Sequence, residues 1–245
     1  MKLWRLLLLA LIPLFLAAWE AAARSSNFLT LLISSPTRLF AYGRINATTL
    51  AYDFAHTLLI AVGGLIMALV VGGAAALAGL RYRPAANFMQ GVSTVAQSIP
   101  LVVFAPFLIL LLGVGTASQI GLASIMAIFP WTISVIGALR IAQYEFDELL
   151  LLYDVPFRSR VYEVYVPHAL PALASSLRIC ASLAVLGAVL AEFTGSAVGL
   201  GRNIFLGTVR LDPELIMSAL LLTSLLGIAT HVILAAVERR ASWWR

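Results

Sequence analysis

The sequence predicts an all-α fold: a polytopic membrane bundle of six transmembrane helices that forms a single domain over residues 1–245. Composition supports this prediction, since 62% of the residues are hydrophobic and 11% are charged. Soluble proteins average about 45–50% apolar and about 25% charged residues. A soluble fold of this size could not bury so much apolar surface, because many residues of any fold face water. Lipid is the solvent that suits this composition.

The second observation is the spacing of long uncharged runs. A helix needs about 20 apolar residues to cross a hydrocarbon core about 30 Å thick. The first such run begins after Lys2 and Arg5, and the second ends before Arg81. The predicted spans are about 3–23, 54–80, 86–112, 119–139, 169–193 and 215–237.

Two of these spans share one uncharged stretch. Residues 84–139 contain no charged side chain, and this stretch is too long for one span but suits two. Residues 113–119 supply glycines and small polar side chains for a turn between the two spans.

Basic residues orient the chain, because cytoplasmic loops of membrane proteins accumulate Lys and Arg. The inside set is Lys2, Arg5, Arg81, Arg83, Arg140, Arg158, Arg160, Arg239, Arg240 and Arg245, against Arg24, Arg38, Arg44, Arg202 and Arg210 outside. The same rule accounts for the net charge of +5 without a nucleic-acid partner. We therefore expect a multi-pass protein of the bacterial inner (plasma) membrane with both termini in the cytoplasm.

The N-terminal span has a second interpretation. Lys2 and Arg5, the apolar core and the alanines at 21–23 also fit a cleavable signal peptide, whose removal would leave five spans. We favour retention, because the apolar run is long and Trp19 resembles an interfacial anchor. Sequencing the mature N-terminus decides between the two.

Residue counts exclude several chemistries. Lys2 is the only lysine, so a P-loop of the form G-x-x-x-x-G-K-[ST] cannot exist in this chain. Cys180 is alone and the three histidines lie far apart, which excludes a cysteine-based metal site and an H-E-x-x-H motif. We expect no catalytic residue, metal or cofactor on this chain; any ATP that drives it binds another subunit.

The most polar segment is the loop predicted over residues 140–168, between the fourth and fifth spans. It is interpreted as two short helices on the cytoplasmic side, with Pro156 in the first turn of the second. Val161, Val164 and Tyr165 follow at i, i+3 and i+4 and make an apolar face. Such a face can lie on the lipid surface or dock into a groove of a cytoplasmic partner, and periodicity alone does not separate these alternatives.

This segment resembles the EAA loop of ABC importer permeases. That pattern has Glu-Ala-Ala, a Gly four residues after the second Ala, and a Leu-Pro about thirteen residues after the Gly. Here Glu148-Leu149-Leu150, Asp154 and Val166-Pro167 stand at these positions, so the spacing is kept while both alanines and the glycine are lost. Asp tolerates the positive φ that Gly would adopt in a tight bend, and its side chain can cap a following helix.

The flanking sequence resembles the nitrate/sulfonate/taurine-type permeases in the order and spacing of short motifs. These are Ser35-Pro36, Ile99-Pro100, Ala105-Pro106, Gly113-Val114-Gly115, Phe129-Pro130 with Gly137, Leu177-Arg178-Ile179, Ala191-Glu192, Gly199-Leu200-Gly201 and Glu238-Arg239-Arg240. Each motif is weak alone. Together they extend over about residues 17–245 and identify the chain as a member of the ABC importer permeases.

The resemblance implies a type I importer fold and a permease subunit that translocates a small solute. The implied partners are a second permease subunit, identical or different, two cytoplasmic ABC ATPase subunits that bind ATP and magnesium, and an extracytoplasmic substrate-binding protein. Residues 148–167 would be the coupling element and 156–165 its docking helix. The implied coupling residues are Glu148, Asp154, Pro156, Arg158, Arg160, Val161, Val164, Tyr165 and Pro167.

Two ionisable residues in the fifth span are candidates for the substrate pathway, because charges within a membrane are functional candidates by default. Arg178 and Glu192 lie about 21 Å apart on one helix, so they cannot pair with each other. Arg178 can instead snorkel to the inner headgroups. Glu192 can cap the interface or pair with a loop residue such as Arg202.

The third span holds the remaining pathway candidates, Gln97, Ser98 and Pro100. A proline there can break the helix and line a cavity with freed carbonyls, or it can simply kink the helix.

Other functions stay open at this level. A stand-alone secondary transporter or channel would show internal repeats and midplane charges, whereas no repeat is found here. A membrane-embedded enzyme would need clustered His or Asp or a Ser/Lys dyad, and none is apparent. The subfamily likeness implies small anions such as nitrate, sulfonates, taurine or bicarbonate, or pyrimidine-type vitamin precursors, as substrates.

Overall fold

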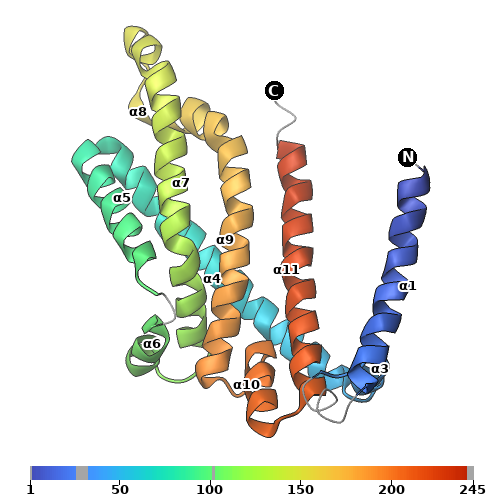
Figure 1. The fold of residues 1–245 in the computed structure, drawn as a ribbon. Coiled ribbons are helices and arrows are strands. Elements are labelled where there is room, and N and C mark those ends of the chain that lie inside the picture. Colours follow the sequence, from blue (N-terminus) through green and yellow to red (C-terminus); the bar gives the residue numbers. More distant parts are fainter. Residues whose placement is uncertain (1, 26–32, 101–102, 242–245) are drawn as a thin grey trace.

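The computed structural model describes residues 2–25, 33–100 and 103–241, and all regular structure in these residues is helical. Figure 1 shows a bundle of long helices with short helices at its two ends. The elements are α1 (Lys2–Arg24), α3 (Pro36–Ile45), α4 (Ala47–Arg81), α5 (Arg83–Ser98), α6 (Phe104–Leu112), α7 (Thr116–Leu152), α8 (Phe157–Ser159), a π-helical turn (Arg160–Tyr165), α9 (Val166–Gly195), α10 (Leu200–Arg210) and α11 (Pro213–Ala241). The all-α prediction is confirmed.

Four described helices are long and apolar enough to cross a membrane. They are Ala47–Arg81, Thr116–Leu152, Phe157–Gly195 and Pro213–Ala236. The first three contain the predicted spans 54–80, 119–139 and 169–193 and extend beyond them, because helical structure continues through the polar ends that hydropathy excludes. The fourth overlaps the predicted span 215–237 except at residue 237. The fold is therefore that of a multi-pass membrane protein.

The other two predicted spans differ from each other. The span expected at 3–23 coincides with α1. The span expected as one helix over 86–112 is instead divided into α5 and α6, of 16 and 9 residues. Ile99 adopts extended backbone angles before Pro100, because a residue that precedes proline avoids the helical region.

Two ends of the bundle are useful reference points. In Figure 1 the chain turns at one end around α8, and at the other around α3, α6 and α10; we call these the α8 end and the α10 end. Helix α1 begins, and α11 ends, on the side of the α8 end. The first residues of α1 and the last residues of α11 thus lie on the same side of the bundle.

Helices α4, α7 and α9 form the centre of the bundle through very close contacts. Ala123 of α7 is fully buried between Gly64 of α4 and Gly187 of α9. A Cβ added at Gly64 would lie 2.4 Å from the Ala123 Cβ, and one added at Gly187 would lie 2.7 Å from its Cα. Small residues permit such close approach of membrane helices, where packing rather than the hydrophobic effect drives association.

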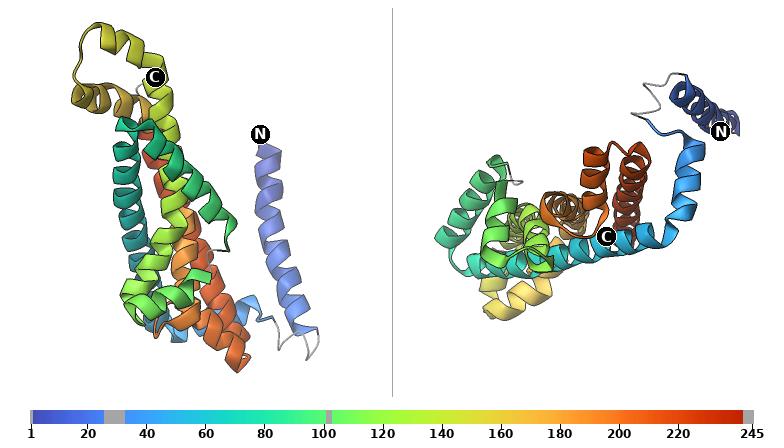
Figure 2. Two further views of the ribbon diagram at one scale, coloured as in Figure 1. Left: turned by 90° about the vertical axis from the view of Figure 1, so that its left-hand side faces the viewer. Right: turned by 90° about the horizontal axis from the view of Figure 1, so that it is seen from below.

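Helix α1 stands apart from the other helices, as both views in Figure 2 show. It is joined to α3 near its C-terminal end. The Glu20 carboxylate accepts hydrogen bonds from the Thr37 amide and hydroxyl at 3.1 and 2.7 Å, and Arg24 pairs with Glu20 at 2.5 Å.

Candidate coupling segment and intramembrane polar cluster

The polar loop predicted over 140–168 does not contain two separate short helices. Helix α7 continues to Leu152, so the first of them is the C-terminal part of α7. The chain then reverses direction in a short turn, and α8, the π-helical turn and α9 follow without interruption. The second predicted helix is thus the first part of a long helix that continues into the membrane.

Asp154 is the residue at which the chain bends. Its φ of 49° is one of two positive values among the described non-glycine residues, which confirms the bend expected where the family pattern has glycine. Its predicted capping role is wrong, because Pro156 occupies the N-cap position of α8 and no side chain caps that helix.

The docking segment, residues 156–165, turns its apolar face inward. Val161 and Tyr165 are 5% and 1% exposed, and Val164 is half-buried. They join a cluster that includes Ala142 of α7 and Ala76 of α4. This face packs against the core of the protein itself. It is therefore buried within the chain, whereas both sequence-based alternatives placed it on the lipid surface or in a groove of a partner.

Polar contacts fasten the docking segment to α7 and α4. The Tyr165 hydroxyl donates a hydrogen bond to Asp147 of α7, and an Arg160 guanidinium nitrogen lies 3.4 Å from the same carboxylate. The Phe157 ring makes cation–π contacts with two guanidinium groups. The Arg81 group lies 5.7 Å and the Arg160 group 5.8 Å from the ring centroid. Asp147, which the sequence did not single out, is therefore the residue that joins this segment to α7.

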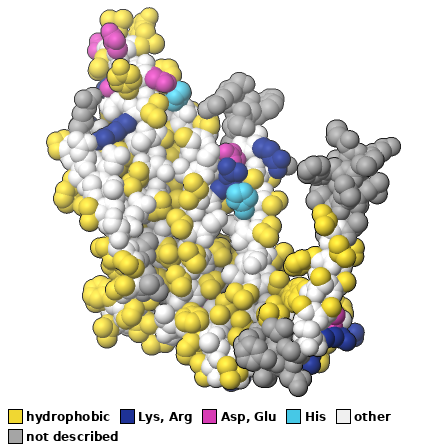
Figure 3. Space-filling view, in the orientation of Figure 1, with side chains coloured by type: hydrophobic (Ala, Val, Ile, Leu, Met, Phe, Trp, Pro, Cys, Tyr) yellow, Lys and Arg dark blue, Asp and Glu magenta, His cyan; other side chains and the backbone are white. Residues whose placement is uncertain are grey.

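The remaining predicted coupling residues lie on the outside of the α8 end. Glu148, Asp154, Pro156, Arg158 and Pro167 are all exposed. They form a polar surface with charges of both signs, and Figure 3 shows acidic side chains at this end of the molecule. A hollow of about 710 Å³ lies beside it, lined by Glu148 together with residues of α5 and α7.

Glu192 lies near the other end and is 1% exposed. Its Oε2 accepts hydrogen bonds from the Thr57 hydroxyl at 2.8 Å and the Gly201 amide at 3.0 Å. Its Oε1 lies 3.1 Å from His56 Nδ1. The sequence-based pairing with Arg202 is thus wrong, because α10 folds back against α4 and brings the Gly201 amide to this carboxylate.

Asp53 extends the same network. It is buried, and its carboxylate accepts hydrogen bonds from the Gly199 amide at 3.0 Å and the Asn203 amide group at 2.6 Å. The Leu200 amide donates to the Thr57 hydroxyl at 3.0 Å. Amides at the start of α10, which a helix cannot satisfy itself, thus find partners on α4 and α9. We call Asp53, His56, Thr57, Glu192 and Asn203 the polar cluster.

Sequence reasoning found only Glu192 of this cluster. The sequence signal that could have indicated the rest of the cluster is Gly199-Leu200-Gly201, because the close approach of this backbone to α9 requires both glycines. Gly199 has φ 117°, and a Cβ there would lie 2.2 Å from Glu192 Cδ. A Cβ at Gly201 would lie 2.1 Å from the Val189 carbonyl oxygen. Glycines in a loop beside a buried carboxylate indicate close backbone approach.

Arg178 is part of an interhelical ion pair rather than a snorkelling residue. Its Nε lies 3.1 Å from Glu238 Oε2 on α11. Ser175 donates a hydrogen bond to the other oxygen of Glu238 at 2.6 Å. Arg178 and Glu192 belong to different networks, as their separation on one helix predicted.

Gln97, Ser98 and Pro100 lie at the exposed C-terminal end of α5 and beyond it. Gln97 and Ser98 donate hydrogen bonds to carbonyls of the preceding helical turn, at 3.2 and 3.4 Å. Within the described residues, no hydrogen bond or ion pair joins them to Arg178 or Glu192. The structure therefore distributes the predicted pathway residues over three separate places.

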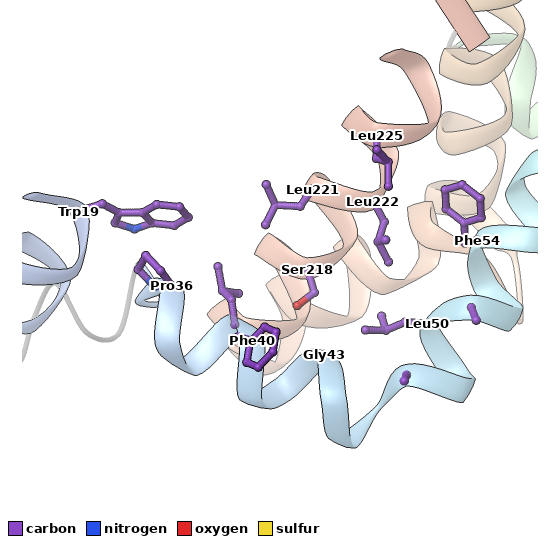
Figure 4. Close-up of a pocket in the computed structure, with 13 residues that line it drawn as sticks. Trp19, Pro36, Phe40, Gly43, Leu50, Phe54, Ser218, Leu221, Leu222 and Leu225 are labelled. Atoms are coloured by element: carbon purple, nitrogen blue, oxygen red, sulfur yellow. The ribbon is translucent and has the colours of Figure 1, made fainter. Parts of the chain in front are cut away.

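An apolar pocket of about 650 Å³ lies between α1, α3, α4 and α11. Figure 4 shows Trp19, Phe40, Phe54 and Leu222 around it, with Ser218 as a polar side chain. No charged side chain lines this pocket among the described residues. It offers nothing that would hold a charged or strongly polar solute.

Comparisons with known proteins agree with this fold. Residues 68–243 match the family described as "Binding-protein-dependent transport system inner membrane component". The chain is similar to a probable ABC transporter permease protein of Haemophilus influenzae, with 28% identity over 99% of each chain. It is also similar to the riboflavin transport system permease protein RibX of Chloroflexus aurantiacus, with 30% identity over 94% of this chain and 87% of that one.

Two further likenesses complete the comparison. The formylaminopyrimidine transport permease protein ThiX of Halalkalibacterium halodurans is 26% identical over 95% of this chain and 93% of its own length. Among solved structures, the inward-facing MetNI methionine ABC transporter has a chain that superposes with a TM-score of 0.69 at 18% identity, covering 80% of this chain and 97% of that one.

Proposed function

The chain belongs to the family of inner-membrane components of binding-protein-dependent transport systems, and we infer from this membership that it is the permease subunit of an ABC importer for a small solute. The likeness to permeases over nearly the whole chain carries this conclusion. The fold of a type I importer permease agrees with it. A stand-alone secondary transporter or channel is accordingly set aside.

The assembly that we propose contains two permease subunits, two ATPase subunits and an extracytoplasmic substrate-binding protein. The α8 end faces the cytoplasm in this proposal, because most basic residues outside the spans lie on that side. Both termini then lie in the cytoplasm. ATP and magnesium bind the ATPase subunits, since this chain has no P-loop lysine, and no catalytic role is assigned to this subunit.

We propose that the exposed residues of the α8 end contact the ATPase. Glu148, Asp154, Pro156 and Arg158 offer charges and a fixed turn to a partner. The buried face of the docking segment, through Tyr165 and Asp147, carries the resulting movement to α7. In this proposal the exposed face of the segment contacts the ATPase, and the buried face transmits the movement to α7.

The substrate that we propose is a small solute of the vitamin-precursor type. The support is the similarity to permeases named for riboflavin and formylaminopyrimidine transport. A permease named for aliphatic sulfonates, SsuC of Bacillus subtilis, matches over 61% of this chain at 25% identity, which makes a small anion the second candidate.

One experiment tests the function. The tagged chain is purified from membranes of its own host, the ATPase that accompanies it is identified, and the complex is reconstituted with the host's binding protein. ATP-dependent uptake of riboflavin, a formylaminopyrimidine or taurine into proteoliposomes supports the proposal. Purification without any ATPase, or uptake that does not require ATP, contradicts it.

A further inference from the structure

We propose that a pocket at the α10 end, between α6, α9 and α10, is a contact site for planar ring-shaped solutes that carry a hydrogen-bond acceptor or an anionic group. This inference rests on the proposed importer function and names the kind of substrate that its permease contacts. The pocket has a volume of about 460 Å³, which lies within the range typical of small-molecule sites. We call it the ring pocket; its lining includes Pro106, Phe193, Thr194, Ser196, Arg202 and Phe205.

The polar cluster sets the position of the ring pocket. One face of α10 is buried through Leu200, Asn203 and Gly207, and the polar cluster holds its first turn against α4 and α9. Arg202 and Phe205, one helical turn apart, therefore lie on another face of α10 and line the pocket. A fixed helix thus presents a cation and an aromatic ring to the same space.

The aromatic part of the ring pocket is a pair of phenylalanines. The rings of Phe193 and Phe205 lie 5.5 Å apart at 82°, an edge-to-face arrangement. They remain 39% and 43% exposed. An edge-to-face pair leaves ring faces open, on which a third planar ring can stack with favourable geometry.

The cation of the ring pocket has donors to spare. Arg202 makes no hydrogen bond or ion pair with any described residue, and its side chain is half-buried. Glu192 lines the same pocket, yet its carboxylate is already bonded to Thr57, Gly201 and His56. A guanidinium presents a rigid fork of donors that suits carboxylate, sulfonate, phosphate or paired carbonyl acceptors.

The hydroxyl groups that line the ring pocket also favour a ligand that supplies acceptors rather than one that needs further donors from the protein. Thr194 donates its hydroxyl to helix carbonyls of α9, and Ser196 is bonded to Gln119 and to Val198. Their protons are therefore used within the protein. The ligand must meet Arg202 with an acceptor and the phenylalanines with a ring.

The two pockets that are larger than the ring pocket lack this combination. The apolar pocket of Figure 4 has no charged side chain among its described lining. In the hollow at the α8 end, Arg140 already donates to Asn87 and Gln90, and Asp147 and Glu148 share the lining. Only the ring pocket, among these three, joins an unpaired cation to an exposed aromatic pair.

The test uses the reconstituted complex with its own ATPase and its binding protein saturated with solute, so that the permease limits the rate. The probes are riboflavin and a formylaminopyrimidine as ring solutes, and taurine as an aliphatic anion. We expect uptake of a ring solute per ATP hydrolysed to fall about tenfold in Arg202→Gln and about threefold in Phe205→Leu. Arg202→Lys keeps the positive charge but lacks the planar fork of donors. Its uptake per ATP hydrolysed should lie between the wild-type value and that of Arg202→Gln.

The matched control is Arg210→Gln, an exposed arginine on the same helix that does not line the pocket. It should leave uptake unchanged. ATPase stimulation by the loaded binding protein should persist in every variant, because the polar cluster that holds α10 is untouched. If Arg202→Gln fails to assemble with the ATPase, the Phe205→Leu result decides.

The experiment has four distinguishable outcomes. Loss of ring-solute uptake with preserved ATPase stimulation supports the ring pocket. Normal uptake per ATP in both Arg202→Gln and Phe205→Leu overturns it, while the importer function stands. Wild-type uptake of taurine alone also overturns the ring-shaped substrate, whereas a wild-type complex with no ATP-dependent uptake of any probe contradicts the importer function itself.

Discussion

The two ends of the bundle both tie helices together with carboxylates, but they do so in different ways. At the α8 end, Asp147 holds Tyr165 and Arg160 at a partly exposed site, surrounded by charges on the surface. At the α10 end, Asp53 and Glu192 are buried, and each accepts a hydrogen bond from a backbone amide as well as from side chains. Side-chain pairs near water can exchange partners at low cost, whereas buried amides cannot be left without one. We infer that the α8 end is suited to movement and the α10 end to rigidity.

The largest expected effect is the loss of Glu192. Glu192→Ala leaves the Gly201 amide and His56 without their acceptor, and each unsatisfied group costs about 1–3 kcal/mol. The Thr57 hydroxyl keeps the Asp53 carbonyl oxygen as an acceptor. We expect the free energy of unfolding to fall by about 2–6 kcal/mol, measured as thermal denaturation in detergent. Glu163→Ala, at an exposed site of the α8 end, should change it by less than about 0.5 kcal/mol. Equal effects at the two sites would remove the contrast between the ends.

Gly199→Ala tests the backbone part of the same site. The added Cβ would collide with the Glu192 carboxylate, and the alanine would have to adopt a strained φ of 117°. Strain of this kind costs about 1–3 kcal/mol, so we expect a stability loss of about 2–3 kcal/mol in the same assay. Gly43→Ala, where a Cβ meets nothing within 4 Å, is the control. A melting temperature unchanged by Gly199→Ala would show that α10 does not dock as described.

Tyr165→Phe should affect coupling more than stability. The hydroxyl bond to Asp147 contributes about 1 kcal/mol, while the ring keeps filling its buried site. We expect a stability loss of about 1 kcal/mol and a several-fold drop in uptake per ATP hydrolysed in the reconstituted complex. Tyr162→Phe, on the exposed side of the same turn, should leave both quantities unchanged. Normal coupling in Tyr165→Phe would mean that the Asp147 contact transmits nothing.

The smallest effect is expected at the bend. Asp154→Gly should change the free energy of unfolding by less than about 0.5 kcal/mol, because glycine adopts φ 49° without strain. For the same reason it should change uptake per ATP hydrolysed by less than about twofold. Asp154→Val should cost about 1–2 kcal/mol more, since a β-branched residue is an outlier at positive φ. A large loss in the glycine variant would show that the carboxylate itself contacts the ATPase.

Sequence patterns predicted the elements better than their partners. Hydropathy located the four long apolar helices, because their apolar length is a local property. The spacing of Val161 and Tyr165 predicted an apolar face, but not what covers it, since the covering residues lie on α7 and α4. For Pro100 the sequence predicts either a break or a kink within one span, and the structure divides that span into two helices.

The polar cluster shows why the candidate site was only partly predictable. Glu192 was conspicuous as a carboxylate in an apolar run. Its side-chain partners, His56 and Thr57, lie in a helix more than a hundred residues earlier, and no local pattern connects them. The packing of α4 against α9 and the return of α10 along the bundle bring these groups together, and both are properties of the tertiary fold.

The contact of Ala123 with Gly64 and Gly187 has a consequence for how access can alternate across the membrane. The Ala123 methyl group lies against the Gly64 backbone, and the Ala123 backbone lies against Gly187. These contacts leave no clearance for sliding, because close-packed interiors change by discrete rearrangement rather than by gradual deformation. Helices α4, α7 and α9 should therefore travel as one rigid body during the transport cycle. The joint that opens and closes must lie elsewhere, either at the extended Ile99 that ends α5 or, in the proposed assembly, at the boundary between two permease subunits.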